Sequence, residues 1–138
     1  MKEKKNKSST LTLFLIILVG ASLLLYPSFS NYWNSFSQSK AIASYMDAVA
    51  NIDEAEYAKI LEAAKQYNER ITSSAISEMT DKEYEDYMSQ LNVAGNGIMG
   101  YIEIPLIGCS LPIYHGTSNS VLQVAIGHLA GSSLPVGG

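Results

Sequence analysis

The chain has 138 residues, a net charge of −4 and a single cysteine. This length allows one modest domain beyond a targeting segment and excludes a two-domain enzyme, and one cysteine excludes an intramolecular disulfide and a multi-cysteine metal site. From Pro27 onward there are five basic and twelve acidic residues, which argues against nucleic acid as a partner and against a basic membrane-binding surface.

The N-terminal end has the pattern of a membrane anchor. Residues 1–10 form a basic tail that contains Lys2, Lys4, Lys5 and Lys7. Residues 11–29 are uncharged and mostly apolar, and they supply about the 18–20 residues that a membrane-spanning helix needs. Because basic residues stay on the cytoplasmic side, we expect a single-pass protein of the cell membrane with a cytoplasmic N-terminus and the remainder outside the membrane.

Aromatic residues follow the apolar run at the level where the outer lipid headgroups would lie. They are Tyr26, Phe29, Tyr32 and Trp33. The alternative to an anchor is a cleaved signal peptide, since Ala41-Ile42-Ala43 resembles a cleavage site. That site lies about 15 residues beyond the apolar run, which is too far for an ordinary signal peptide. We therefore favour the uncleaved anchor.

Residues 30–72 form a predicted helical region with a break near residues 51–53. Asn51, three residues before Glu54, is the predicted N-cap of the second helix. Apolar residues recur at helical spacing on both sides of the break, which predicts packing within the domain; a partner-binding or coiled-coil face has the same pattern. These residues are Ile42, Tyr45, Met46, Val49 and Ile52, then Tyr57, Ile60, Leu61, Ala64, Tyr67 and Ile71.

Residues 73–94 are expected to form a lid-like loop that carries one short helix. The loop opens with Ser73, Ser74 and Ser77, and Thr80-Asp81-Lys82-Glu83 then forms a capping box. The short helix has one apolar face, made of Tyr84, Tyr87, Met88 and Leu91. A mobile surface flap and an ordinary connection between helices both fit this pattern.

Residues 95–138 have the pattern of an unfinished β-fold. Residues 98–105 alternate as a strand does, with Ile98, Ile102 and Ile104 expected on one face. Residues 109–114 form a second predicted strand, in which Pro112 requires an edge, a bulge or a strand end.

The remaining residues complete no sheet in this prediction. Ser118 or Asn119 is expected to cap a short helix that ends at Ala125, and residues 127–138 are expected to be loop because they are rich in glycine, serine and proline. Two or three short strands cannot close a barrel, so we expect the chain to be a fragment of a longer protein.

Cys109, His115 and His128 are the candidate reactive residues, since the chain has one cysteine and two histidines. A nucleophile–base pair is one interpretation of them. We favour structural roles instead: a half-buried thiol at a strand start, a hydrogen-bonded turn histidine and a loop histidine. No cation adjoins the thiol in sequence to lower its pKa. No metal-binding, phosphate-binding or calcium-binding motif is present, so we expect no metal and no other cofactor.

Three sequence blocks resemble the start of the β-barrel in class C (pilin-type) sortases. They are NGIMGYIEIP at 96–105, LPIYHGT at 111–117 and VAIGHLAGSSLPVGG at 124–138. The implied fold is a membrane-anchored α+β protein. It has an N-terminal transmembrane helix, a helical front section with a lid-like loop, and the first strands of an incomplete sortase-type β-barrel at 95–138.

The resemblance implies a cysteine transpeptidase that cleaves LPXTG-like sorting signals through a thioacyl intermediate and joins pilin or other surface proteins to a lysine amine. In that family the catalytic cysteine, histidine and arginine follow the Leu-Pro-Val-Gly-Gly block. We therefore expect no catalytic residue in this chain, because all three would lie downstream of Gly138. Cys109, His115 and His128 are not their counterparts, and the fragment alone is expected to be inactive.

One departure from the family and one alternative function remain. Class C sortases usually carry an Asp-Pro-aromatic motif in the lid, whereas this sequence has no Asp-Pro pair and keeps only Asp86-Tyr87, on a predicted helix. The alternative is a non-enzymatic, membrane-tethered adaptor outside the cell that binds a partner through its helical section.

Overall fold

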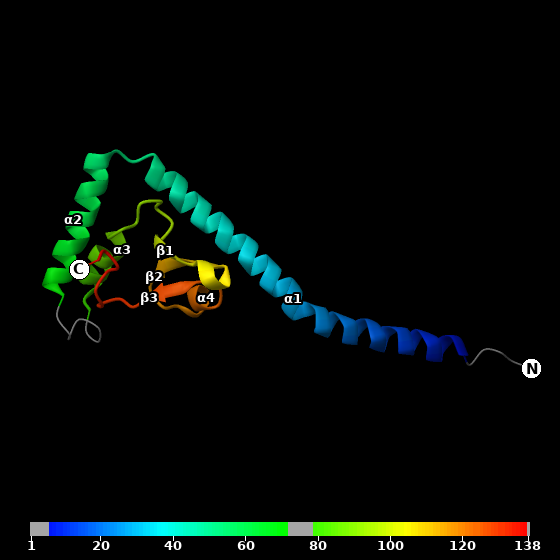
Figure 1. The fold of residues 1–138 in the computed structure, drawn as a ribbon. Coiled ribbons are helices and arrows are strands. Elements are labelled where there is room, and N and C mark those ends of the chain that lie inside the picture. Colours follow the sequence, from blue (N-terminus) through cyan, green and yellow to red (C-terminus); the bar gives the residue numbers. More distant parts are fainter. Residues whose placement is uncertain (1–5, 72–78, 138) are drawn as a thin grey trace, which may run out of the picture. The chain divides into compact units, whose positions relative to one another are not determined.

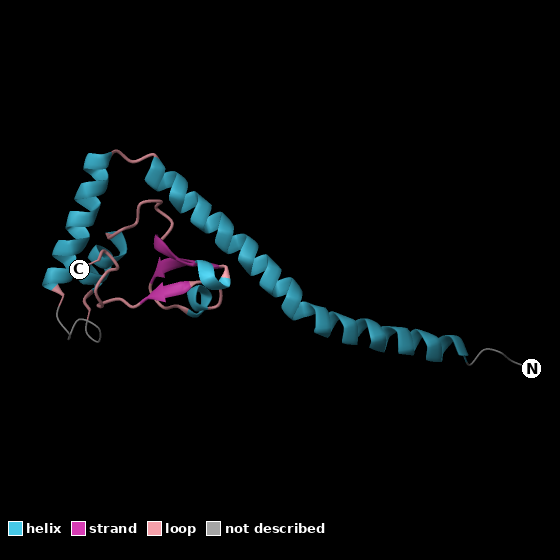
Figure 2. Ribbon diagram, viewed as in Figure 1, coloured by secondary structure: helices cyan, strands magenta, loops and turns pink. Residues whose placement is uncertain are grey.

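The computed structural model describes residues 6–71 and 79–137 (Figure 1). Within them lie a long helix, two shorter helices, a three-stranded sheet and one further helical turn (Figure 2). The chain divides into two compact units, Met1–Phe36 and Ser37–Gly138. The mixed α+β class is thus confirmed.

The first element is a continuous helix, α1 (Asn6–Ala50), which passes through Pro27 without ending. Its large apolar side chains between Leu11 and Phe36 are 51–81% exposed. In the part of the chain that the structure describes, Ser9–Ala50 is the one helix long and apolar enough to cross a membrane. Beyond Phe36 the helix belongs to the second unit, where the Tyr45 hydroxyl donates to the Met99 carbonyl at 3.3 Å.

Helix α2 (Glu54–Arg70) begins directly after the predicted break at residues 51–53, but its N-cap is not the predicted residue. The break after α1 is where it was predicted, but the N-cap is Asp53, whose carboxylate accepts from the Glu56 N–H at 2.7 Å. The prediction of Asn51 was wrong because its amide instead donates to the Asp47 carbonyl at 2.8 Å, at the end of α1.

Helix α3 (Asp81–Ser89) has the predicted capping box. The Thr80 N–H donates to the Glu83 carboxylate at 2.8 Å, and the Glu83 N–H donates to the Thr80 hydroxyl at 3.4 Å. These bonds satisfy backbone donors that the first helical turn leaves free. The earlier part of the expected lid-like loop, including Ser73, Ser74 and Ser77, lies outside the described residues.

The sheet has the order β1-β2-β3. Strand β1 (Ile98–Ile104) pairs antiparallel with β2 (Cys109–His115), and the 3-10 turn η1 (Pro105–Ile107) joins them. The register shifts between Ile98 and Gly100. This bulge buries both Ile98 and Met99, whereas Ile102 and Ile104 are about 40% exposed. The expectation that three isoleucines share one face was therefore wrong, since a bulge interrupts strict alternation.

Strand β3 (Ile126–His128) corrects the prediction that residues from Gly127 onward are loop. It pairs in parallel with β2, and α4 (Asn119–Leu122), capped by Ser118, lies on the crossover between them. This pairing begins at Ile113, one residue after Pro112. Pro112 therefore pairs only with β1, through Tyr101, and stands at a local edge on the β3 side, as its missing N–H requires.

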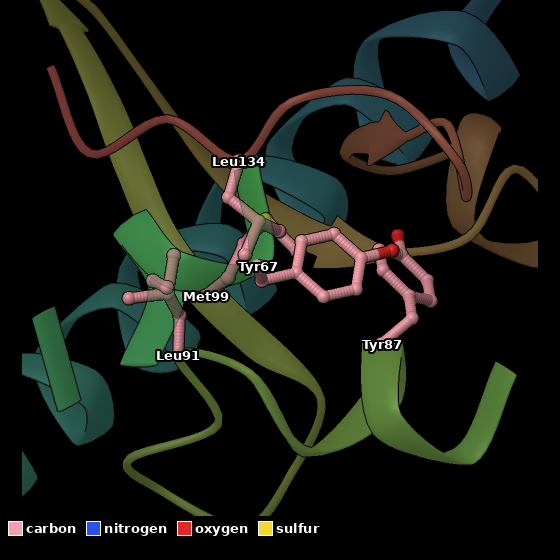
Figure 3. Packing of buried hydrophobic residues seen from close by; sticks show 6 residues of the cluster. Tyr67, Tyr87, Leu91, Met99 and Leu134 are labelled. Carbon is pink, nitrogen blue, oxygen red and sulfur yellow. The ribbon is translucent and has the colours of Figure 1, made fainter. Parts of the chain in front are cut away.

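The buried core lies between α2, α3, the sheet and the C-terminal loop (Figure 3). Its members are Ala64 and Tyr67 of α2, Tyr87 of α3, Leu91, Met99 of β1 and Leu134. Asn68 fixes the loop to α2, since its amide donates to the Leu134 carbonyl at 3.0 Å and accepts from the Leu134 N–H at 2.7 Å. The apolar face of α2 thus packs within its own domain, as predicted.

Candidate functional site: a buried tyrosine between two histidines

The two histidines, thirteen positions apart in sequence, are register partners in the sheet. His115 ends β2, and His128 ends β3 beside it in the parallel pair. The prediction of a turn and a loop for these residues was thus wrong in location, because each belongs to a strand. What brings them together is the parallel pairing after α4, for which the local sequence gives no signal.

Tyr87 projects from α3 against both imidazole rings. Its side chain is fully buried, and its ring centroid lies 5.1 Å from that of His115 and 5.7 Å from that of His128. The hydroxyl accepts from the Gly116 N–H at 3.0 Å and donates to the His128 carbonyl at 2.9 Å. Gly116 has a φ of 77°, a left-handed conformation suited to glycine, at the turn that follows β2.

His128 is held through both ring nitrogens. Its Nε2 lies 3.0 Å from the Ser133 carbonyl, and its Nδ1 lies 3.1 Å from the Tyr87 hydroxyl. A carbonyl only accepts, so Nε2 donates to Ser133; the one Tyr87 hydroxyl proton goes to the His128 carbonyl, and Nδ1 lies beside the hydroxyl oxygen as a close polar contact. The ring thereby links α3, β3 and the following loop.

His115 is also held on both sides, and only 6% of it is exposed. Its Nδ1 lies 2.9 Å from the Gly97 carbonyl and its Nε2 lies 2.7 Å from the Gln90 carbonyl. Both partners are backbone carbonyls, so whichever ring nitrogen carries the proton donates it to one of them, and the other nitrogen is enclosed beside the second carbonyl. Because both ring nitrogens face backbone carbonyls inside the fold, His115 connects the segment after α3 to the start of β1.

Burial also governs the acidity of Tyr87. Desolvation raises the pKa of its phenol to about 12, and the bond from the Gly116 N–H opposes this shift only in part. The phenol is therefore protonated near neutral pH and acts as a hydrogen-bond donor. The Tyr87, His115 and His128 cluster stabilises the fold rather than activating a nucleophile.

Cys109 lies at the opposite end of β2 from His115. It is half-buried and pairs with Ile104 where the β1–β2 hairpin turns. The thiol and His115 are six positions apart along the extended strand, which is about 20 Å at 3.3 Å per residue. Since His128 is beside His115, Cys109 can form a nucleophile–base pair with neither histidine in this fold.

A separate pocket of about 360 Å³ opens beside the core. It is bounded by residues of α1, α2 and β1, among them Tyr45, Ile60 and Met99, and none of its lining residues is a histidine or a cysteine. Among residues 6–71 and 79–137, no group of three or more His, Cys, Asp or Glu side chains is placed to hold a metal ion. The pocket offers apolar contact and phenol groups but no acid–base pair.

The chain is similar to solved structures of sortases. Sortase C1 of Streptococcus agalactiae is 52% identical over 72% of this chain and 52% of its own, with a TM-score of 0.67. The resemblance to class C sortases is confirmed. A lid mutant of sortase A from Corynebacterium diphtheriae is 42% identical over 62% of this chain and 47% of its own, with a TM-score of 0.54.

A second class C structure has the same fold and covers a similar share of the chain. Sortase C-1 of Actinomyces oris is 39% identical over 59% of this chain and 47% of its own, with a TM-score of 0.50. This chain therefore spans about half the length of the sortases it matches. No family model matches the chain, and no curated protein matches it.

Proposed function

We propose that this chain is the N-terminal part of a class C sortase, a cysteine transpeptidase. The observation that carries the proposal is the 52% identity to S. agalactiae sortase C1, together with a TM-score of 0.67 over the same residues. The proposed substrates are pilin or other surface proteins with LPXTG-like sorting signals. A thiolate would attack the threonine carbonyl and break the Thr–Gly peptide bond, and the glycine amine would leave with a proton. A lysine amine of the next subunit would then attack the thioester, form an amide bond to the threonine and release the thiolate.

The groups that perform this reaction are proposed to lie outside the 138 residues. In the second unit, Cys109 is about 20 Å from the histidines, and both histidines have their ring nitrogens occupied. We therefore assign the catalytic cysteine, histidine and arginine to sequence downstream of Gly138. The described residues would supply the front of the barrel and its helical support.

Membrane anchoring belongs to the same proposal. The apolar part of α1 is exposed along its length, and the lysines of residues 1–10 precede it. These features support a single span at 11–29 with the N-terminus in the cytoplasm and the second unit outside. The remaining boundaries are proposed as a helical region at 30–72, a lid-like loop at 73–94 and the start of the barrel at 95–138.

A peptide assay separates this proposal from the adaptor alternative. Residues 1–138 and the product of the longest reading frame that contains them would each be incubated with a fluorescence-quenched LPXTG peptide and an amine acceptor. We expect cleavage between threonine and glycine by the longer product and none by residues 1–138. No cleavage by either polypeptide would favour the adaptor.

Cys109 provides the internal control for this assay. The Cys109→Ala variant of the longer product should retain the parent rate, because the thiol faces no histidine. Loss of turnover on this substitution, with the fold intact by circular dichroism, would show that the assignment of the nucleophile is wrong.

A further inference from the structure

The uncharged part of α1 is longer than a membrane span. No charged residue occurs between Lys7 and Lys40, a stretch of 32 residues. As a helix this stretch measures about 48 Å, whereas the hydrocarbon core of a bilayer is about 30 Å thick. About twelve residues of uncharged helix therefore need a place other than the hydrocarbon core.

The aromatic residues that follow the apolar run all fall on one side of the helix. They are Tyr26, Phe29, Tyr32, Trp33 and Phe36, and each is 60–71% exposed. At 100° per residue these five occupy an arc of about 120°. Ser28, Ser30, Asn31 and Asn34 all lie outside that arc, on the opposite side.

Aromatic residues on one side of a helix over several turns differ from the aromatic belt of an upright transmembrane helix, which lies at a single headgroup level. From Tyr26 to Phe36 the helix rises about 15 Å, more than the headgroup layer of one leaflet, which is about 5–8 Å thick. An upright helix would therefore carry part of this aromatic face out of the headgroup layer. A helix along the membrane surface would place all five rings at one depth and keep the serines and asparagines in water.

We propose that residues 26–36 lie along the outer membrane surface, with the aromatic face turned into the lipid and the polar face turned to water. The face is continuous in α1 with the uncharged run before it. In this arrangement residues 8–26, about 28 Å of helix, cross the hydrocarbon core in place of 11–29, so the bilayer that accepts them is the nearest apolar phase. Pro27 stands where the two segments meet, and its missing N–H leaves the Leu23 carbonyl without its usual helical partner, a common cause of a helix bend. This inference rests on the proposed membrane anchoring.

The single tryptophan makes the proposal measurable in the full chain. The 138-residue protein would be placed in phosphatidylcholine vesicles that carry bromine at either a shallow or a deep acyl position, and quenching of Trp33 would be recorded. Two single-tryptophan variants move the probe: Trp33→Phe with Phe36→Trp, and Trp33→Phe with Asn31→Trp. The first keeps the probe on the aromatic face, and the second places it on the polar face.

The two orientations predict opposite orders of quenching. In a surface helix, probes at 33 and 36 are quenched alike by shallow bromine, and the probe at 31 is quenched less because it faces water. In an upright helix each residue toward the C-terminus lies about 1.5 Å farther from the bilayer centre, so the tryptophan at 31 is quenched most and the tryptophan at 36 least. This second order would overturn the proposal, as would blue-shifted emission that no lipid quenches, which would indicate a second protein copy on the aromatic face.

A probe inside the span separates this inference from the anchor itself. Leu18→Trp, combined with Trp33→Phe, should be quenched more by deep than by shallow bromine. If that result holds while the probes at 31, 33 and 36 follow the upright order, only the surface orientation is wrong. If the probe at 18 is not quenched, membrane anchoring fails and the inference fails with it.

Discussion

Removing the Tyr87 hydroxyl tests whether the cluster with the two histidines holds α3 to the sheet. In Tyr87→Phe the ring keeps its position against Tyr67 and both imidazoles, and only the oxygen is lost. That change leaves the Gly116 N–H and the His128 carbonyl without a partner that they have at 3.0 and 2.9 Å. A buried group that loses its partner costs about 1–3 kcal/mol, so we expect a loss of about 2 kcal/mol in the free energy of unfolding.

Hydrogen exchange provides the assay, because it reports local opening of the strands in detergent-solubilised protein. A loss of about 2 kcal/mol corresponds to roughly thirtyfold faster exchange of protected amides in β2 and β3. Tyr84→Phe is the matched control, since Tyr84 lies one turn earlier on α3 and is 46% exposed. If the two variants exchange alike, within about twofold, the hydroxyl contributes no stability and the argument for the cluster is refuted.

Three further predictions concern the same unit. Burial raises the pKa of Tyr87 to about 12, so above pH 10 the unfolded chain loses this proton before the folded chain does. The free energy of unfolding should therefore fall between pH 10 and 12. Urea titrations at these pH values should show a smaller fall for Tyr87→Phe. Gly127→Ala would place a Cβ 2.5 Å from the Gly116 carbonyl oxygen and should lower the free energy of unfolding by about 1–3 kcal/mol, measured by thermal unfolding. Gly100→Ala is the control, because it has open space around it and should be neutral or slightly stabilising. Asn68→Ala should lower the free energy of unfolding by about 1–3 kcal/mol, because two hydrogen bonds to the Leu134 backbone are lost. Gln66→Ala, on the exposed side of α2, is the control and should change the melting temperature little.

Features that depend on neighbours in sequence could be predicted from the sequence. The capping box at Thr80 and Glu83 is such a feature, because both bonds close within three residues. The same locality explains the error at the start of α2. Asn51 and Asp53 each precede a glutamate by three residues, so the pattern fits both, and only the fold shows that Asn51 bonds backward to α1.

Features that depend on pairing across the fold could not be predicted in the same way. Strand β3 has only three residues, and its extended conformation is fixed by β2 rather than by its own propensity. The bulge beside Met99 likewise has no local signal, although it decides which isoleucines are buried. The meeting of His115 with His128 depends on both the parallel register and the crossover, so the central cluster of the site was beyond sequence reasoning.

The exposed apolar surface of the second unit bears on the choice between sortase and adaptor. The adaptor alternative assigns partner binding to the helical section, yet the apolar face of α2 is used in the core. The two most exposed large apolar side chains among the described residues of this unit lie instead at the turn of the β1–β2 hairpin, where Leu106 is 94% and Ile107 is 69% exposed, with Ile104 about 40% exposed beside them. An uncovered apolar patch on a short sheet calls for further protein to cover it. The remainder of the proposed sortase barrel would supply such a cover, whereas the adaptor alternative places its partner on helices whose apolar face in α2 is already packed in the core.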